Sequence, residues 1–327
     1  MGGPRHILSA SSIGLAVLMA VAGSADGNGR YAIRAGKIVT VTQGVINNGV
    51  VLIADGKIQA VGPASEIDIP KGHEVIDASD KWLMPGMVEI HSHAGAQGGL
   101  NDMVSQTNPG MRIGDGVDPD SEIITMALAA GVTTIQTLPG SGTNHGGFGV
   151  AFKTAGKTKK DRIVRRVSAM KIAQAYNPER PGGDLGATRM GMAWMLREHL
   201  DRAKAYEDAS VAHERGKGKK PPKPDIALEM TRPIFRGELP VLIHTYETWG
   251  MLMTMAMLGE RYGARATATH CAFNGHRAAD TVGKLNFPVN IGPRVTDFYG
   301  NGDARFRGMI PTYAEGGTTE LSVNTDS

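Results

Sequence analysis

From Gly86 onward, short apolar runs alternate with segments of helical character, and this alternation restricts the chain to few folds. It is typical of a parallel α/β sheet, because strands covered by helices on both faces are apolar throughout. The clearest helical segments are residues 120–131 and 188–216. Eight runs qualify as strands: "GMVEIHSH", "GVTTIQTLPG", "GVAFKTA", "RVSAMKIA", "LPVLIHTY", "ARATATHC", "FPVNIGP" and "ELSVNTD". Together they predict an α/β protein of the (β/α)8 TIM-type barrel class, with its active site at the carboxyl ends of the strands.

Residues 31–81 have a different pattern, in which β-branched runs are separated by turn signals. Asp55-Gly56 and Gly36-Lys37 both resemble the turns of β-hairpins. The sequence therefore predicts a small all-β module over residues 26–84, followed by the barrel domain over residues 85–327.

Residues 1–25 combine a short positive start with the apolar stretch "ILSASSIGLAVLMAVAG" and small residues suited to cleavage. This pattern predicts a signal peptide and an exported protein, either periplasmic or secreted. The competing interpretation is an uncleaved membrane anchor. Ser and Gly interrupt the stretch, however, and it is short against the roughly 20 apolar residues of a membrane span. We therefore expect no stable membrane anchor after cleavage.

The charge balance argues against a nucleic-acid partner. The 35 basic and 32 acidic residues leave a formal net charge of only +3, which does not indicate a phosphate-binding surface. The basic cluster at residues 215–224 contains no aromatic residues between its lysines, as expected of a solvated loop. The expected partner is a small-molecule substrate.

Two histidines, His91 and His93, end the first predicted barrel strand. Side chains two residues apart on a strand project to the same face, so both imidazoles can reach one ion. The motif alone is weak, because surface or hydrogen-bonded histidines are common. Its position strengthens it, since His244, His270 and Asp326 each finish a separate predicted strand. Imidazole and carboxylate are the ligand types that hold zinc with one position open for water.

The stretch "LMPGMVEIHSHAG", preceded by a β module and followed by strand-end histidines and a late "NTDS", resembles the amidohydrolase superfamily, near its exported and imidazolonepropionase-like members. The resemblance implies that His91, His93 and His244 are metal ligands. It implies that His270 is a ligand or orients the substrate, and that Asp326 is the metal-bound acid/base. It also implies that the N-terminal module is the first half of a β-sandwich.

Many members of this superfamily add a carboxylated lysine or a glutamate that bridges a second metal. Lys171, in the predicted strand "RVSAMKIA", is the candidate for such a carboxylated bridge. A lysine in an apolar strand is costly to bury without compensation. Pairing with a carboxylate explains its presence equally well, and Lys153 is a weaker candidate for the same role. The expected cofactor is a divalent metal, zinc above all, as one ion or two.

These residues predict a metal-dependent hydrolase that cleaves carbon-nitrogen bonds in amides, cyclic amides or peptide-like substrates. A bound divalent ion would lower the pKa of its water toward about 7, and Asp326 would take the proton and pass it to the leaving nitrogen. The alternative is a non-catalytic metal-binding or oligomerising fragment of such an enzyme. A metal-free barrel with scattered histidines is a third hypothesis.

The chain stops one residue after Asp326, so the barrel would lack its last helix. Apolar surface left uncovered there predicts association as a homo-oligomer or poor stability. A truncated reading frame is one explanation, and completion by another chain is the other.

The segment "PGSGTNHGGFG", residues 139–149, has the composition of a flexible loop. Its glycines fit neither nucleotide-binding spacing, so a phosphate cradle is not expected. We expect a loop over the barrel mouth, with His145 either touching substrate or exposed. Cys271 is expected to face the helices as a small buried residue, because its neighbour His270 faces the mouth.

Overall fold

The computed structural model divides the chain into two compact units. The first comprises Met1–Met87 with Ala129–Gly131, and the second comprises Val88–Leu128 with Val132–Ser327. The predicted signal peptide lies outside the part of the chain that the structure describes. The described residues are 29–96, 98–180, 186–217, 220–245, 247–298 and 306–326.

The first unit contains a four-stranded sheet in the order β3-β2-β1-β4. Its strands are β1 (Arg30–Val39), β2 (Val45–Ala54), β3 (Lys57–Pro63) and β4 (Glu74–Leu83). The predicted hairpin turn at Asp55-Gly56 is confirmed: it joins antiparallel β2 and β3, and both residues have positive φ, as such two-residue turns require. Small apolar clusters, one around Ala32 and Val50 and another around Ile38 and Val51, stabilise this sheet.

The predicted hairpin at Gly36-Lys37 is wrong, because both residues lie inside β1. The register between β1 and parallel β4 shifts between Ala35 and Lys37. A Cβ atom at position 36 would collide with the carbonyl oxygen of Ser79. The glycine therefore marks a bulge where two backbones approach closely, which is the other common meaning of glycine in a strand.

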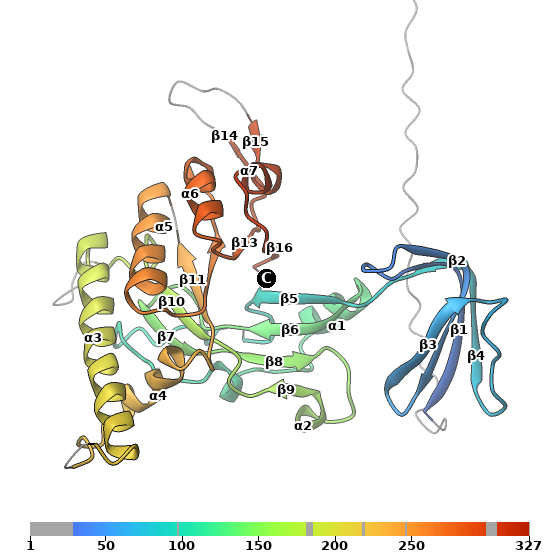
Figure 1. The fold of residues 1–327 in the computed structure, drawn as a ribbon, viewed down its shortest axis with the longest axis horizontal. Helices are drawn as coiled ribbons and strands as arrows, with labels where there is room; N and C mark the ends of the chain where they lie inside the picture. Colours follow the sequence, from blue (N-terminus) through green and yellow to red (C-terminus); the bar gives the residue numbers. More distant parts are fainter. Residues whose placement is uncertain are drawn as a thin grey trace, which may run out of the picture. The chain divides into compact units, whose positions relative to one another are not determined.

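The second unit contains all eight predicted strand runs as strands, arranged in two sheets (Figure 1). One sheet has the order β16-β13-β12-β11-β10-β7 and the other has the order β5-β6-β8-β9. A separate hairpin pairs β14 with β15. The strands are β5 (Met87–Ser92), β6 (Val132–Thr137), β7 (His145–Phe148), β8 (Val150–Lys153), β9 (Ile163–Arg165), β10 (Met170–Ala173), β11 (Val241–Thr245), β12 (Ala266–His270), β13 (Val289–Ile291), β14 (Thr296–Phe298), β15 (Phe306–Gly308) and β16 (Leu321–Val323).

The α/β class is confirmed, but the expectation of eight parallel strands is wrong at the third run. β8 pairs antiparallel with β6, with Thr137 opposite Val150. Residues 138–149, which connect these strands, contain β7 and no helix. A parallel connection is usually a helical crossover, and without a helix in this segment the chain returns antiparallel instead. By contrast, β10, β11, β12, β13 and β16 are all parallel.

Helices pack against one face of the six-stranded sheet (Figure 1). The predicted helices at 120–131 and 188–216 are confirmed as α1 (Glu122–Ala129) and α3 (Arg189–Glu214). The others are α2 (Lys159–Arg162), α4 (Ile226–Phe235), α5 (Thr248–Met255), which continues as a π-helix over Ala256–Arg261, α6 (Ala279–Lys284) and α7 (Met309–Glu315), with short 3₁₀ segments at Ile113–Asp115 and Gly275–Ala278. Within the described ranges, none of the helices is both long and apolar enough to span a bilayer.

Side chains alternate along the parallel strands between this helix side and the opposite face. Met170 and Ile172 of β10 pack in one core cluster with Leu196 and Leu200 of α3, which leaves Lys171 on the opposite face. In β11, Val241 and Ile243 join the same cluster, so His244 also faces away from the helices. The apolar alternation thus decides which polar side chains can meet.

The prediction of a loop throughout residues 139–149 is wrong, because His145–Phe148 form strand β7. His145 is fully buried and not exposed. His145 stands opposite Ile172 in the antiparallel pairing of β7 with β10, which places it on the helix side. Its ring lies edge-to-face with His199 of α3, with 4.9 Å between ring centroids. His199 in turn shares a hydrogen bond with Thr231 of α4. His145 therefore belongs to the packing between sheet and helices.

This pair should make the fold sensitive to acid. Burial holds the pKa of His145 well below its usual value, and it also lowers the pKa of His199. An unfolded histidine takes up a proton below about pH 6.5, so the unfolded state binds more protons and stability falls as the pH falls.

Replacing His145 with leucine should remove one such group. Between about pH 6 and about pH 5, the free energy of unfolding should fall with decreasing pH in both proteins. We expect this fall to be about 1.4 kcal/mol per pH unit smaller in His145→Leu than in the wild type. Urea unfolding of zinc-free protein at several pH values measures this slope. Parallel stability curves for the two proteins would contradict the assignment.

Candidate metal centre

The structure brings together all six residues that the sequence analysis singled out. His91 lies in β5, Lys171 in β10, His244 in β11 and His270 at the end of β12. His93 directly follows β5, and Asp326 lies three residues after the end of β16. Parallel strands end at the same edge of a sheet, which brings together the four residues from the six-stranded sheet, whereas His91 and His93 come from the other sheet. The candidate site is this cluster of six side chains.

Asp326 links the two histidines of the first strand. Its Oδ1 atom lies 3.5 Å from Nε2 of His91 and 3.4 Å from Nε2 of His93. These three residues each offer one ligand atom, and the three atoms lie within 4.8 Å of one another. That spacing allows a single ion to contact all three.

The remaining candidates extend the cluster from His91. The ring centroids of His91 and His270 lie 4.8 Å apart, and those of His270 and His244 lie 4.7 Å apart. Nζ of Lys171 lies 3.1 Å from Nε2 of His91. The group is therefore continuous from His93 through to His244.

His270 reaches this cluster through an unusual backbone conformation. Ala266 and Ala268 of β12 pack in the helix-side cluster, so strict alternation would direct His270 to the helices as well. His270 instead has φ of 69°, in the left-handed region, which breaks the alternation at the strand end. Asp326 is also left-handed, with φ of 56°. Backbone strain of this kind concentrates at functional sites.

Two backbone carbonyls orient two of the imidazoles. Nδ1 of His93 donates to the carbonyl oxygen of Leu138 at 2.9 Å, and Nδ1 of His270 donates to that of Gly292 at 2.7 Å. A neutral imidazole carries one N–H, so each ring then presents an unprotonated Nε2. Metal-binding histidines are held by such outer hydrogen bonds.

Burial keeps the imidazoles of the cluster uncharged. It lowers the pKa values of His93 and His270 to about 4. The pKa values of His91 and His244 are held well below their usual range, again chiefly by burial. Neutral imidazole is the form that binds a metal ion, because the proton would otherwise occupy the ligand atom.

Burial acts on the lysine and the aspartate as well. Lys171 is fully buried, and this lowers the pKa of its amine to about 7, against the attraction of Asp326. Burial raises the pKa of Asp326, while His93 and Lys171 oppose the shift. Near neutral pH, a substantial part of the Lys171 amine is therefore unprotonated.

The donor set fits a divalent ion. Oδ1 of Asp326 is buried, yet it accepts no hydrogen bond of ordinary geometry from any residue that the structure describes. The nearest imidazole nitrogens are those of His91 and His93, and a carboxylate with several imidazoles is a typical zinc donor set. His91, His93, His244, His270 and Asp326 are the residues that could hold the ion.

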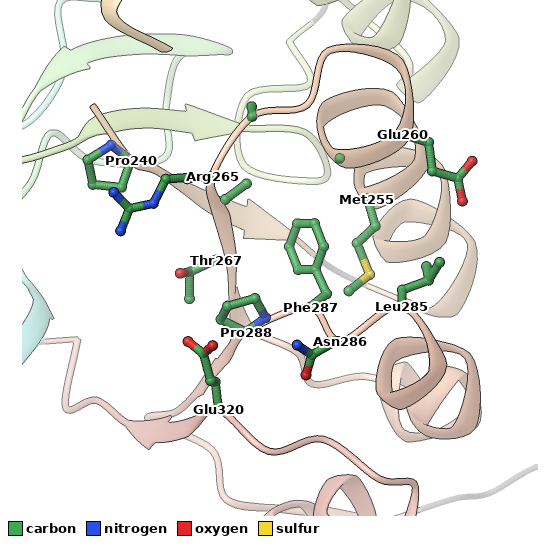
Figure 2. A pocket seen from close by; sticks show the side chains of 13 residues that line it. Pro240, Met255, Glu260, Arg265, Thr267, Leu285, Asn286, Phe287, Pro288 and Glu320 are labelled. Carbon is green, nitrogen blue, oxygen red and sulfur yellow. The ribbon is translucent and has the colours of Figure 1, made fainter. Parts of the chain in front are cut away.

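A separate cavity of about 560 Å³ lies at the other ends of the strands (Figure 2). Pro240, Arg265, Pro288 and Glu320, which precede β11, β12, β13 and β16, contribute to its wall. None of the six candidate residues lines it. The candidate chemistry is therefore at the carboxyl ends of the strands and not at this cavity.

The predicted site omitted Glu89 and the two carbonyl groups that orient His93 and His270. Glu89 is buried and accepts the backbone N–H of His91. Its spacing of two residues from His91, on the same strand face, was an available signal. The prediction for Cys271 is confirmed: it is buried in the helix-side cluster, and burial raises the pKa of its thiol to about 12.

The chain is similar to several known proteins over part of its length. No family model matches the chain. An imidazolonepropionase from Rhizobium rhizogenes is 27% identical over 162 residues, covering 42% of this chain and 40% of that protein. The amidohydrolase tasK from Hapsidospora irregularis is 29% identical over 181 residues, covering 49% of this chain and 18% of that protein. The chain thus spans less than half the length of these curated relatives.

A crystal structure described as an amidohydrolase from Thermotoga maritima MSB8 superposes on 90% of this chain with a TM-score of 0.77, at 24% sequence identity, and the match covers 78% of that structure. At this identity the match shows a shared fold. The chain is thus similar in sequence to proteins named imidazolonepropionase and amidohydrolase, and similar in fold to a protein described as an amidohydrolase.

Proposed function

We propose that this protein is a metal-dependent hydrolase that cleaves a carbon-nitrogen bond in an amide, a cyclic amide or a peptide-like small molecule. The observation that carries the proposal is the convergence of four neutral imidazoles, a carboxylate and a buried lysine at one edge of the strands. The names of the relatives, imidazolonepropionase and amidohydrolase, support the same reaction class.

We assign His91, His93, His244, His270 and Asp326 as the residues that hold a divalent ion, zinc by the chemistry of the donors. When bound there, such an ion would act as a Lewis acid and would lower the pKa of a coordinated water toward about 7. The outer hydrogen bonds of His93 and His270 keep their Nε2 atoms available without a rearrangement of the rings.

Asp326 is the proposed proton carrier. Its carboxylate lies beside the imidazoles of His91 and His93, and burial makes it a stronger base than an exposed aspartate. It accepts a proton from the attacking water and returns it to the nitrogen that leaves, so that the amine departs neutral. His270, with Nδ1 occupied, holds the ion or accepts a hydrogen bond from the substrate through Nε2.

Lys171 is the proposed carboxylated residue of a two-ion site. Its unprotonated amine adds to carbon dioxide, forming one N–C bond and releasing one proton, and the resulting carbamate supplies two oxygen ligands. Full burial, the lowered pKa and the position of Nζ 3.1 Å from His91 support this role. If Lys171 is not carboxylated, the remaining residues form a site for one ion.

We also propose the remaining features of the family arrangement. The parallel strands of the second unit belong to a barrel of the (β/α)8 type in which β8 is an antiparallel exception, and the four-stranded sheet of the first unit belongs to a β-sandwich. The fold match to the Thermotoga structure supports this architecture. The composition of residues 1–25 supports export to the periplasm or the exterior.

Metal content is the first test of the proposal. The folded chain, exposed to zinc and then desalted, should retain about one or two equivalents, and the double variant His91→Ala/His93→Ala should lose them. The bound ion should raise the free energy of unfolding by about 2.7 kcal/mol when free zinc is a hundred times its Kd, and a chelator should reverse this.

The control is His73→Ala/His213→Ala, which removes two histidines outside the cluster and should leave metal content unchanged. Elemental mass spectrometry and thermal melts provide the two readouts. A folded wild-type chain that retains no zinc, cobalt or manganese would contradict metal dependence.

Asp326→Asn tests the reaction itself. The amide cannot take the proton from water, so kcat/KM for hydrolysis should fall by about 10²–10⁴-fold. The assay measures amine release from a panel of N-acyl amino acids, cyclic amides and dipeptides, using zinc-loaded protein. The surface variant Asp208→Asn is the control and should remain active. Equal activity of Asp326→Asn and wild type would remove the assigned role.

A further inference from the structure

Glu89 connects two segments that are 236 residues apart in sequence. It lies on β5, two residues before His91, and only 8% of the residue is exposed. One carboxylate oxygen accepts the backbone N–H of His91 at 2.8 Å. The other accepts the backbone N–H of Thr325 at 2.9 Å and its hydroxyl at 3.2 Å. Thr325 immediately precedes Asp326.

The two connected segments belong to different sheets. β5 lies in the four-stranded sheet of the second unit, whereas β16, which precedes Thr325, is the edge strand of the six-stranded sheet. The carboxylate of Glu89 therefore holds the two groups together where strand pairing does not. One of its oxygens contacts the backbone of the proposed ligand His91. The other contacts the residue next to the proposed ligand Asp326.

We infer that Glu89 is a positioning residue, which sets the separation between the His91/His93 pair and Asp326 and so preorganises the ion site. This inference rests on the proposed function. Glu89 acts through the backbone of His91 and Thr325, so it is not assigned a catalytic role.

The chemistry of the group explains why glutamate is required. A carboxylate only accepts hydrogen bonds and can do so at both oxygens, and all three partners here are donors. Glutamine has nearly the same shape, but one of its two positions is an NH₂ donor. Glu89→Gln therefore leaves a buried N–H facing another donor on one side of the link. The geometry between the two ligand segments loosens while the volume of the side chain is kept.

A purely structural role is the alternative, in which Glu89 stabilises the fold and has no influence on the ion site. The chain offers a matched control for it. Glu207 is also buried, with 5% exposed, and its carboxylate bridges Arg232 and Arg236 between α3 and α4. Glu207→Gln makes the same chemical change on the helix layer, away from the strand ends.

The experiment measures zinc affinity by chelator competition and the thermal melting of zinc-free protein for the wild type and both variants. Glu89→Gln should weaken zinc binding by about 10–100-fold, the usual effect of losing an outer partner of a metal site. Glu207→Gln should lower the melting temperature and leave zinc affinity unchanged. Thr325→Val removes one of the three hydrogen bonds and should weaken zinc binding by about fivefold. It provides the test if Glu89→Gln does not fold.

The outcomes separate the inference from the proposed function. If the wild type binds zinc and Glu89→Gln or Thr325→Val binds it equally well, the positioning role is wrong and the proposed metal site stands. If Glu207→Gln weakens zinc binding as much as Glu89→Gln, the effect is general destabilisation and the inference is overturned. If the wild type binds no zinc, the proposed site fails, and the inference fails with it.

Discussion

Parallel pairing of β10, β11, β12, β13 and β16 is the constraint on which the rest of the second unit depends. It directs the carboxyl ends of five strands to one edge, and each of three strand ends supplies a candidate residue there: His244, His270 and Asp326. Helices on one face bury the apolar alternate positions, so the polar alternate positions face away from them. The site is therefore a consequence of strand direction and alternation, with local exceptions.

Burial of these polar side chains costs desolvation free energy, but it also favours the protonation state in which the imidazoles bind an ion. Removing the imidazoles from water disfavours their charged form, and two carbonyls hold the single proton of His93 and His270 at Nδ1. The amine of Lys171 is shifted in the same direction. The imidazole shifts favour unprotonated ligand nitrogens, so metal binding would not have to displace protons from the four histidines near neutral pH. Burial shifts the pKa of Asp326 in the other direction.

The eight strand segments and the six cluster residues could be predicted because each signal is local. A strand is an apolar run bounded by turns, and an ionisable residue at its end is visible in the printed sequence. The wrong predictions also came from local sequence signals, but each of these signals is compatible with two different structures. Gly36 marks a bulge rather than a turn, and the glycine-rich segment around His145 forms a buried strand because its backbone pairs with β10. Composition cannot distinguish these cases, since the partner that decides each of them is distant in the sequence.

The sequence by itself determined the α/β alternation, the strands, and the identity of the histidines, the lysine and the aspartate that form the cluster. Periodicity and residue chemistry are properties of short segments, so neighbouring residues suffice to specify them. Only the tertiary structure decided that β8 is antiparallel, that His145 faces the helices and that His270 turns to the cluster. It also decided that Glu89 joins the first strand of the site to its last residue. These features depend on contacts between segments far apart in the chain, and the distance between those segments exists only once the chain has folded.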